Sequence, residues 1–238
     1  MTLQGKTILI TGASAGIGRA CAMQLAGQGA HIIALGRRQD ALDALAAALP
    51  AGQVRTLAGD LNDEAFIAQI EALAPSLDAF VNNAGVLRYA PILELTPEDS
   101  AWMFQTNVLA ALRVTQVIAR AMVKNKRGHI VFMSSIAARE VYKLASVYSA
   151  TKHALSALAR SFRIELQSQG IKVTEVAPGM VDTEIRAAST HPDVLASVAH
   201  RKFKALTADE VAQAVVYALC ANPNCCPDLI ELRPQGSA

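Results

Sequence analysis

Near its start the chain reads Thr7-Ile8-Leu9-Ile10-Thr11-Gly12-Ala13-Ser14-Ala15-Gly16-Ile17-Gly18-Arg19, a strand-like run, a glycine-rich turn and the beginning of a helix. Glycines at such a turn let the backbone approach a ligand closely, and the free N–H groups at a helix N-terminus suit a pyrophosphate. The spacing G-x-x-x-G-x-G differs from the usual dinucleotide fingerprint G-x-G-x-x-G. Alone, this spacing also fits a tight turn with no ligand, but its place after the first strand favours a phosphate-binding site.

Short apolar runs alternate with longer helical patterns along the whole chain. Strands are predicted over Thr7–Thr11, His31–Leu35, Val54–Ala58, Ala79–Asn82, His129–Ser134, Lys172–Ala177 and Asp228–Leu232. Helices are predicted over Ile17–Gln28, Gln39–Leu49, Asp63–Leu73, Pro97–Lys124, Val147–Gln169 and Ala208–Ala221. Most of the strands are continuously apolar, which is typical of parallel strands covered on both faces. The alternation predicts a single doubly wound, Rossmann-like α/β domain over residues 1–238, with a seven-stranded parallel sheet and helices on both faces.

Two segments depart from this alternation. Pro97–Lys124 is too long for a simple crossover, and we expect it to hold two consecutive helices. Thr183–Leu206 lies between a strand and the last helix and has no strand pattern. Insertions after the carboxyl end of a strand often cover ligands, so residues 183–206 are predicted to form a substrate lid.

Composition excludes several classes of protein. The chain has 238 residues, 52% of them hydrophobic and 18% charged, with a net charge of +2. Such a composition excludes a disordered protein, and the balanced charge gives no footprint for nucleic acid or an anionic membrane. No apolar run is long enough to span a membrane, and the start has no secretory pattern. The cysteines (Cys21, Cys220, Cys225 and Cys226) fit reduced thiols better than disulfides or a metal site. A cytoplasmic protein without a metal is expected.

The end of the second strand indicates which dinucleotide binds. The chain there reads Leu35-Gly36-Arg37-Arg38, where an acidic residue would bond the ribose 2′-hydroxyl of NAD. Arginine instead accommodates the 2′-phosphate of NADP. Arg37 and Arg38 can also be ordinary surface charges. Asp40, the only nearby carboxylate, suits the first turn of the next helix. We therefore expect NADP (NADPH) as the cofactor.

A candidate catalytic group follows the fifth strand. Tyr148 and Lys152 share one face of a predicted helix, because residues four apart are neighbours there. A nearby ammonium favours the phenolate and would lower the pKa of the tyrosine, which suits proton exchange with an alcohol or carbonyl. The hydroxyl of Ser135, upstream at the strand end, can hydrogen-bond the same oxygen. Alone, Y-x-x-x-K also fits a core tyrosine with a surface lysine.

Taken together and in order, these motifs resemble the short-chain dehydrogenase/reductase (SDR) family, and the resemblance covers essentially the whole chain. It rests on the glycine turn, Asn82-Asn83-Ala84-Gly85, Ser135, the Tyr148/Lys152 pair and Pro178-Gly179. The ending Ile230-Glu231-Leu232-Arg233-Pro234 resembles the branch with NADP-dependent 3-hydroxy acid dehydrogenases and serine dehydrogenases. One departure is Ala15, where many members carry a basic residue of the NADP site, so the cofactor prediction rests on Arg37 and Arg38.

The resemblance implies a role for each matching residue. Catalysis would use Ser135 to orient the substrate oxygen, Tyr148 to transfer the proton, Lys152 to bond the nicotinamide ribose and lower the tyrosine pKa, and Asn107 to anchor a water. The cofactor would contact Gly12, Ser14, Gly16, Ile17 and Gly18 through its phosphates, Asp60 and Leu61 through adenine, Asn83, Ala84 and Gly85 through ribose, and Pro178, Gly179, Val181 and Thr183 through the carboxamide.

The expected function is interconversion of a secondary alcohol with a ketone or aldehyde. A catalytically silent dinucleotide-binding redox sensor and a Rossmann-like methyltransferase are the alternatives, and the intact catalytic set disfavours both. The substrate is left open: Arg88, Arg139 and Lys143 on edge loops, and Arg186, Arg201, Lys202 and Lys204 in the lid, could meet a carboxylate or simply face water.

A homotetramer is expected. The predicted helices Val147–Gln169 and Pro97–Lys124 carry apolar residues on more than one face, which a monomer would expose. Family resemblance implies that both helices pair with symmetry mates. A monomer in which neighbouring helices cover these faces is the alternative.

Overall fold

The computed structural model describes residues 2–187, 189–200 and 202–237. Its seven strands are β1 (Thr7–Thr11), β2 (His31–Gly36), β3 (Val54–Ala58), β4 (Ala79–Asn82), β5 (Gly128–Met133), β6 (Ile171–Pro178) and β7 (Leu229–Leu232). They form one sheet in the order β3-β2-β1-β4-β5-β6-β7, and every pairing is parallel. The order in which strands are added to the sheet reverses between β1 and β4: β2 and β3 lie on one side of β1, and β4 to β7 lie on the other. Open α/β sheets bind ligands at such a switch point. The predicted Rossmann-like fold is confirmed.

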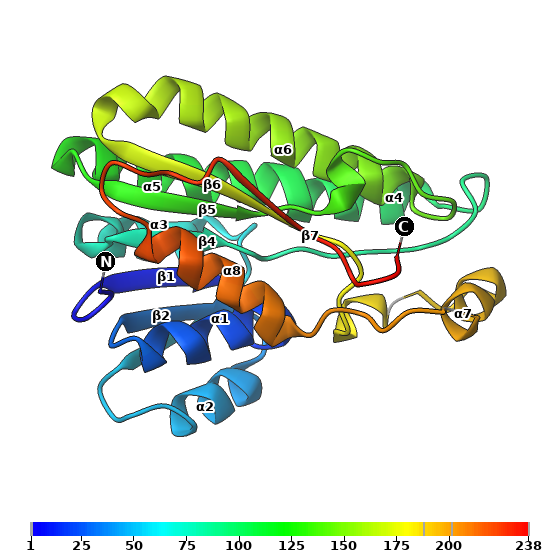
Figure 1. The fold of residues 1–238 in the computed structure, drawn as a ribbon, viewed down its shortest axis with the longest axis horizontal. Helices are drawn as coiled ribbons and strands as arrows, with labels where there is room; N and C mark the ends of the chain where they lie inside the picture. The colour runs from blue at the N-terminus through cyan, green and yellow to red at the C-terminus, as the bar shows by residue number, and fades with distance from the viewer. Residues whose placement is uncertain (1, 188, 201, 238) are drawn as a thin grey trace.

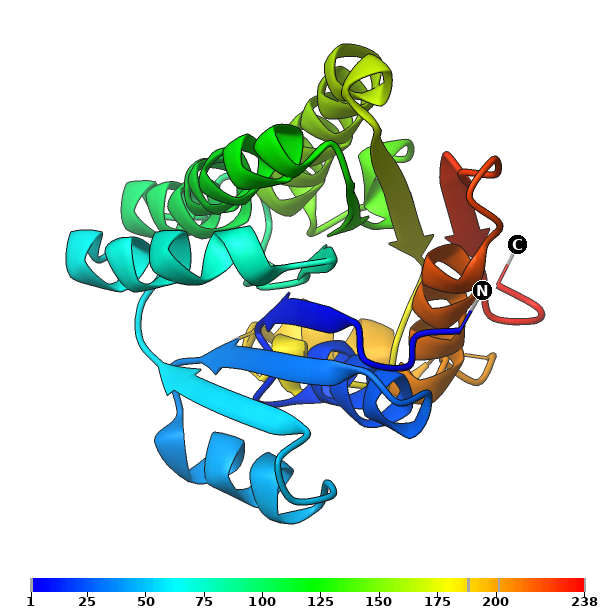
Figure 2. The same ribbon diagram turned by 90° about the vertical axis from the view of Figure 1, so that its left-hand side faces the viewer.

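Helices cover both faces of the sheet (Figure 1). They are α1 (Gly16–Gly27), α2 (Gln39–Ala47), α3 (Glu64–Leu73), α4 (Pro97–Phe104), α5 (Ala111–Asn125), α6 (Ser146–Leu166), α7 (Pro192–Ala199) and α8 (Ala208–Cys220). Figure 2 shows the two layers from the end, with α1 and α8 on one side of the sheet and α5 and α6 on the other.

Each face of the sheet has its own apolar core, which follows from the period of two along a strand. Ile8 and Ile10 point into the core beneath α1, α2 and α8, whereas Leu9 between them joins the core beneath α3, α5 and α6. Ile8, Leu9 and Ile10 are fully buried. Continuous apolar runs were therefore a correct sign of strands covered on both faces.

The predicted pair of consecutive helices within Pro97–Lys124 is found as α4 and α5. A π-helical turn, Gln105–Ala110, joins them, and the backbone stays helical at both junctions. Single π turns inside helices often occur at functional sites. This one contains Asn107, which is almost fully buried.

The segment after β6 lies beyond the carboxyl ends of the strands, at the right of Figure 1. It holds a 3₁₀ turn (Glu184–Arg186) and α7, neither of which the sequence pattern predicted. Val181 and Leu206 form an isolated parallel bridge that ties its two ends together. Its residues 188 and 201 lie outside the described part of the chain. No helix among the described residues is both long and apolar enough to cross a membrane.

Candidate active site

A cavity of about 950 Å³ opens at the carboxyl edge of the sheet, beside the loops that follow β1 and β4. Most of the residues predicted for catalysis and cofactor binding line it, although they come from seven separate stretches of the chain. They are Gly12, Ser14, Gly16, Ile17, Arg37, Arg38, Asp60, Leu61, Asn83, Ala84, Gly85, Ser135, Tyr148, Lys152, Pro178, Gly179, Val181 and Thr183. Gly18 and Asn107 are not part of the lining.

The glycine turn between β1 and α1 has the backbone that its sequence suggested. Gly12 and Gly16 have φ of +67° and +50°, in the left-handed region that favours glycine. The first turn of α1 contains no acidic residue, and its N-cap, Ala15, supplies no side-chain hydrogen bond. The N–H groups and the positive end of this helix are therefore available to an anion, as a phosphate site requires.

The β4 loop is tied to this turn. The hydroxyl of Thr11 accepts hydrogen bonds from the backbone N–H groups of Asn83 and Ala84, both at 3.0 Å. The Asn83 amide donates in return to the Thr11 carbonyl at 2.9 Å. These bonds fix the position of the cavity floor relative to the phosphate turn.

Gly18, for which a contact with the cofactor phosphates stays a prediction, is not part of the cavity lining. A Cβ atom there would lie 2.2 Å from the carbonyl oxygen of Gly12 and 2.5 Å from Asn83 Nδ2. Its lack of a side chain lets α1 pack against the turn, behind the cavity wall rather than in it.

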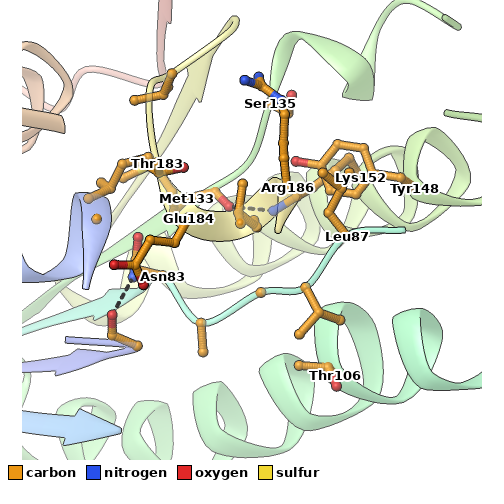
Figure 3. A pocket seen from close by; sticks show the side chains of 18 of the residues that line it. Asn83, Leu87, Thr106, Met133, Ser135, Tyr148, Lys152, Thr183, Glu184 and Arg186 are labelled. Atoms are coloured by element: carbon orange, nitrogen blue, oxygen red, sulfur yellow. Dashed lines mark hydrogen bonds between the residues drawn. The ribbon is translucent and has the colours of Figure 1, made fainter. Parts of the chain in front are cut away.

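Tyr148 and Lys152 lie in the cavity with Ser135 (Figure 3). Burial raises the pKa of Tyr148, the nearby Tyr89 adds to the rise, and a hydrogen bond with Ser135 and the charge of Arg186 oppose it. Lys152 Nζ lies 5.7 Å from the Tyr148 ring centroid and donates to the Met133 carbonyl at 3.0 Å. Desolvation therefore sets the direction of the Tyr148 pKa shift in this structure, which is upward. A lowering of that pKa by Lys152 stays a prediction.

Lys152 is 5% exposed, and burial lowers its pKa to about 8. The opposing influence is Glu175, a carboxylate in the middle of β6 that is 2% exposed. Arg139 and the Ser156 hydroxyl both donate to Glu175 Oε2 at 2.9 Å. Glu175 was not among the predicted site residues, although an acidic residue inside an apolar strand is a signal that could have indicated it.

Asn107 lies behind the cavity, where it holds neighbouring backbone in place. Its Oδ1 accepts from the Val86 N–H at 2.7 Å, and its Nδ2 donates to the Val86 carbonyl at 2.9 Å and to Thr151 Oγ1 at 3.1 Å. Both amide hydrogens are therefore used. A role in anchoring a water stays a prediction.

The two arginines after β2 are exposed on the cavity rim. Arg38 Nη1 lies 3.3 Å from Glu184 Oε2, so part of its charge is already paired. Asp40 lies in the first turn of α2, as expected. Arg37, in contrast, forms no ion pair with any described residue.

Most of the other cationic candidates for a substrate contact are engaged elsewhere or exposed. Arg88 pairs with Asp99 at 3.3 Å, and Arg139 with Glu175. Lys202 and Lys204 are exposed, and Arg201 lies outside the described residues. Lys143 and Arg186 do line the cavity.

The family model for short chain dehydrogenases matches residues 6–193. An uncharacterized oxidoreductase of Staphylococcus aureus (strain N315) is 31% identical over 236 residues, which are 98% of each chain. A similar oxidoreductase from Staphylococcus haemolyticus, likewise named as uncharacterized, is 32% identical with the same coverage.

Two solved structures with bound NADP are similar to this chain. The closed form of a serine dehydrogenase complexed with NADP⁺ superposes with a TM-score of 0.87 at 29% identity, covering 94% of this chain and 93% of that one. A putative NAD(P)-dependent gluconate 5-dehydrogenase from Beutenbergia cavernae with bound NADP gives a TM-score of 0.84 at 30% identity, covering 97% and 96%.

Proposed function

The chain belongs to the short-chain dehydrogenase family of NAD(P)-dependent oxidoreductases, and from that premise we propose that it uses NADP to interconvert a secondary alcohol with a ketone, or a primary alcohol with an aldehyde. The observation that carries the proposal is the presence of Ser135, Tyr148 and Lys152 in the same cavity as an uncapped helix N-terminus and two arginines. One part of the cavity thus suits a phosphorylated dinucleotide and the other suits proton transfer.

The chain's own residues fit the cofactor. The positive-φ turn at Gly12 and Gly16 and the free end of α1 would hold the pyrophosphate, and Arg37 and Arg38 the 2′-phosphate. Asp60 and Leu61, then Asn83, Ala84 and Gly85, would follow the adenine and ribose along the cavity wall. When bound, the cofactor would supply the hydride in its reduced form, NADPH, or accept it in its oxidised form, NADP⁺.

Tyr148 would handle the proton. Because burial raises its pKa, the phenol is protonated at neutral pH and ready to donate to a carbonyl oxygen. Ser135 shares a hydrogen bond with that phenol and would hold the substrate oxygen beside it. Lys152, with a pKa of about 8, carries its positive charge at neutral pH and would bond the ribose. We propose that residues 183–206 close over the substrate as a lid.

A panel of ketones and aldehydes tests the proposal. We expect the protein to oxidise NADPH with at least one class of carbonyl compound, monitored by loss of NADPH absorbance. A catalytically silent redox sensor, the alternative function, would bind NADPH but reduce none of these ketones and aldehydes. The four cysteines are free thiols, which fits the cytoplasm as the place of this activity.

Cofactor preference gives a quantitative prediction. Each charge-assisted hydrogen bond to the 2′-phosphate contributes roughly 1.5–3 kcal/mol, so one arginine should give roughly 10–100-fold discrimination for NADPH over NADH. We expect Arg37→Ala to remove more of the preference than Arg38→Ala, because Glu184 already pairs with Arg38. The measurement is kcat/KM for both cofactors in each variant. A wild-type preference for NADH would contradict the prediction and direct attention to Asp40.

We further propose a homotetramer. Apolar side chains remain exposed on the outer layer of helices: Phe104 at 40%, Leu109 at 53% and Ile164 at 69%. Closed symmetry with two different two-fold interfaces would cover such surfaces. Sedimentation equilibrium is expected to report four times the mass of the 25.1 kDa chain. A single species at the monomer mass would show that these side chains face water.

A further inference from the structure

Arg186 is the last residue of the 3₁₀ turn that follows β6, and its side chain reaches into the cavity beside the catalytic group (Figure 3). The figure places it next to Ser135, Tyr148 and Lys152. Its positive charge acts on the Tyr148 phenol. Arg186 therefore lies where the reacting part of a substrate would be.

The guanidinium of Arg186 has no anion of its own in the described part of the chain. Its Nε is enclosed and has no hydrogen-bond partner among residues 2–187, 189–200 and 202–237. Leaving a buried donor of a charged group unpaired costs free energy, typically about 1–3 kcal/mol or more. Such an orphan near a reacting centre is explained when a ligand supplies the missing acceptor.

The carboxylates around the cavity are committed elsewhere. Two acidic residues, Asp60 and Glu184, belong to the described lining. Glu184 pairs with Arg38. Asp60 Oδ1 accepts hydrogen bonds from the backbone N–H of Asn62 at 2.9 Å and from its side-chain Nδ2 at 2.8 Å. The contrast with Arg139 is informative, because that arginine has Glu175 and Glu231 as partners.

We propose that Arg186 binds a carboxylate of the substrate, so that the enzyme acts on hydroxy acids and keto acids. The inference deepens the proposed function and rests on it. A guanidinium presents parallel N–H groups that match the two oxygens of a carboxylate. Leu87, Met180 and Ile185 add apolar surface to the same cavity, which suits a short carbon chain better than a second charged group.

The reaction balances with the groups named. In the reductive direction the carbonyl carbon of the keto acid gains a hydride from NADPH, and its oxygen gains the proton of Tyr148. The products are the hydroxy acid and NADP⁺, and Tyr148 regains its proton from solvent. Arg186 takes no part in these transfers, because its role is to fix the carboxylate so that the carbonyl meets Ser135 and Tyr148.

The test compares acids with their neutral esters in the whole enzyme. Acetoacetate and levulinate, each beside its methyl ester, are assayed with NADPH in wild type, Arg186→Gln and Arg186→Lys. For at least one acid we expect Arg186→Gln to lower kcat/KM roughly 10–100-fold, the value of one charge-assisted contact, while the ester changes less than about twofold. Arg186→Lys should retain part of the activity on the acid. The matched control is Arg55→Gln at an exposed position of β3, which removes the same charge from a residue outside the cavity lining.

A binding measurement separates this proposal from the proposed function. Isobutyrate and its neutral analogue isobutyramide are titrated calorimetrically into the complex of the enzyme with NADP⁺. We expect isobutyrate to bind more tightly than isobutyramide in wild type and to lose that advantage in Arg186→Gln. If no carbonyl compound is reduced but this difference appears, the oxidoreductase function fails and the carboxylate site stands. Equal affinity for the two in wild type, or equal losses for acid and ester in Arg186→Gln, would overturn the carboxylate site.

Discussion

Tyr148→Phe is expected to lower kcat by about 10²–10⁴-fold, the usual contribution of general acid–base catalysis. The substitution removes only the phenolic oxygen. The ring keeps its edge-to-face contact with Tyr89, whose centroid lies 6.2 Å away, and the packing around Lys152 is unchanged. NADPH affinity should stay close to that of wild type, because the phosphate turn and the arginines after β2 lie on other elements. Stopped-flow turnover and fluorescence titration of NADPH measure the two quantities separately.

The matched control is Tyr217→Phe, which removes a hydroxyl from an exposed position on α8. That variant should keep both turnover and stability. If Tyr148→Phe turned over at the wild-type rate, the proton would have to come from another group, and Ser135 would be the next candidate because its hydroxyl bonds the same phenol. The raised pKa of Tyr148 adds a second expectation: reduction, which needs the protonated phenol, should persist above neutral pH.

The main elements of the fold could be predicted because each depends on local pattern. β1, β3 and β4 have the predicted bounds, and continuous apolar runs correctly indicated burial on both faces. α7 was missed because it lies in a segment with Ala, Ser and His at positions that gave no clear apolar stripe. The π turn before α5 was also missed. Its Asn107 bonds with Val86 and Thr151, which lie in distant parts of the sequence, so no local pattern expresses these contacts.

The candidate site also combines features that the local sequence predicts with features that depend on tertiary structure. Spacing places Tyr148 and Lys152 on one helical face, but it does not reveal how deeply they are buried, and burial sets the pKa of both. Glu175 influences Lys152 from another strand, a relation that no local motif expresses. Arg186 was one of several lid cations in the sequence. Only tertiary structure shows that its Nε is enclosed and unpaired while Arg88 and Arg139 have partners.

Gly18→Ala is expected to weaken NADPH binding strongly and to destabilise the protein. The new Cβ would lie 2.2 Å from a backbone oxygen of Gly12 and 2.5 Å from Asn83 Nδ2, so α1 or the turn must shift. Overpacking of this kind costs about 1–3 kcal/mol, or roughly 2–12 °C in Tm for a chain of this size. A shift of the turn also moves the N–H groups of Gly12 and Gly16 that the phosphates would use.

Gly27→Ala tests the same chemistry with the opposite expected sign. Gly27 ends the same helix, is exposed, and has open space where a Cβ would lie. Alanine there should raise stability by about 0.5–1 kcal/mol, because it reduces the freedom of the unfolded chain without a clash. Thermal unfolding and NADPH titration of the two variants, side by side, measure both effects. A Gly18→Ala protein with wild-type Tm and affinity would mean that α1 is not packed against the turn as closely as the distances indicate. If Gly18→Ala loses NADPH affinity while Gly27→Ala gains thermal stability, the close approach of α1 to the turn, rather than glycine content, is what the phosphate turn requires.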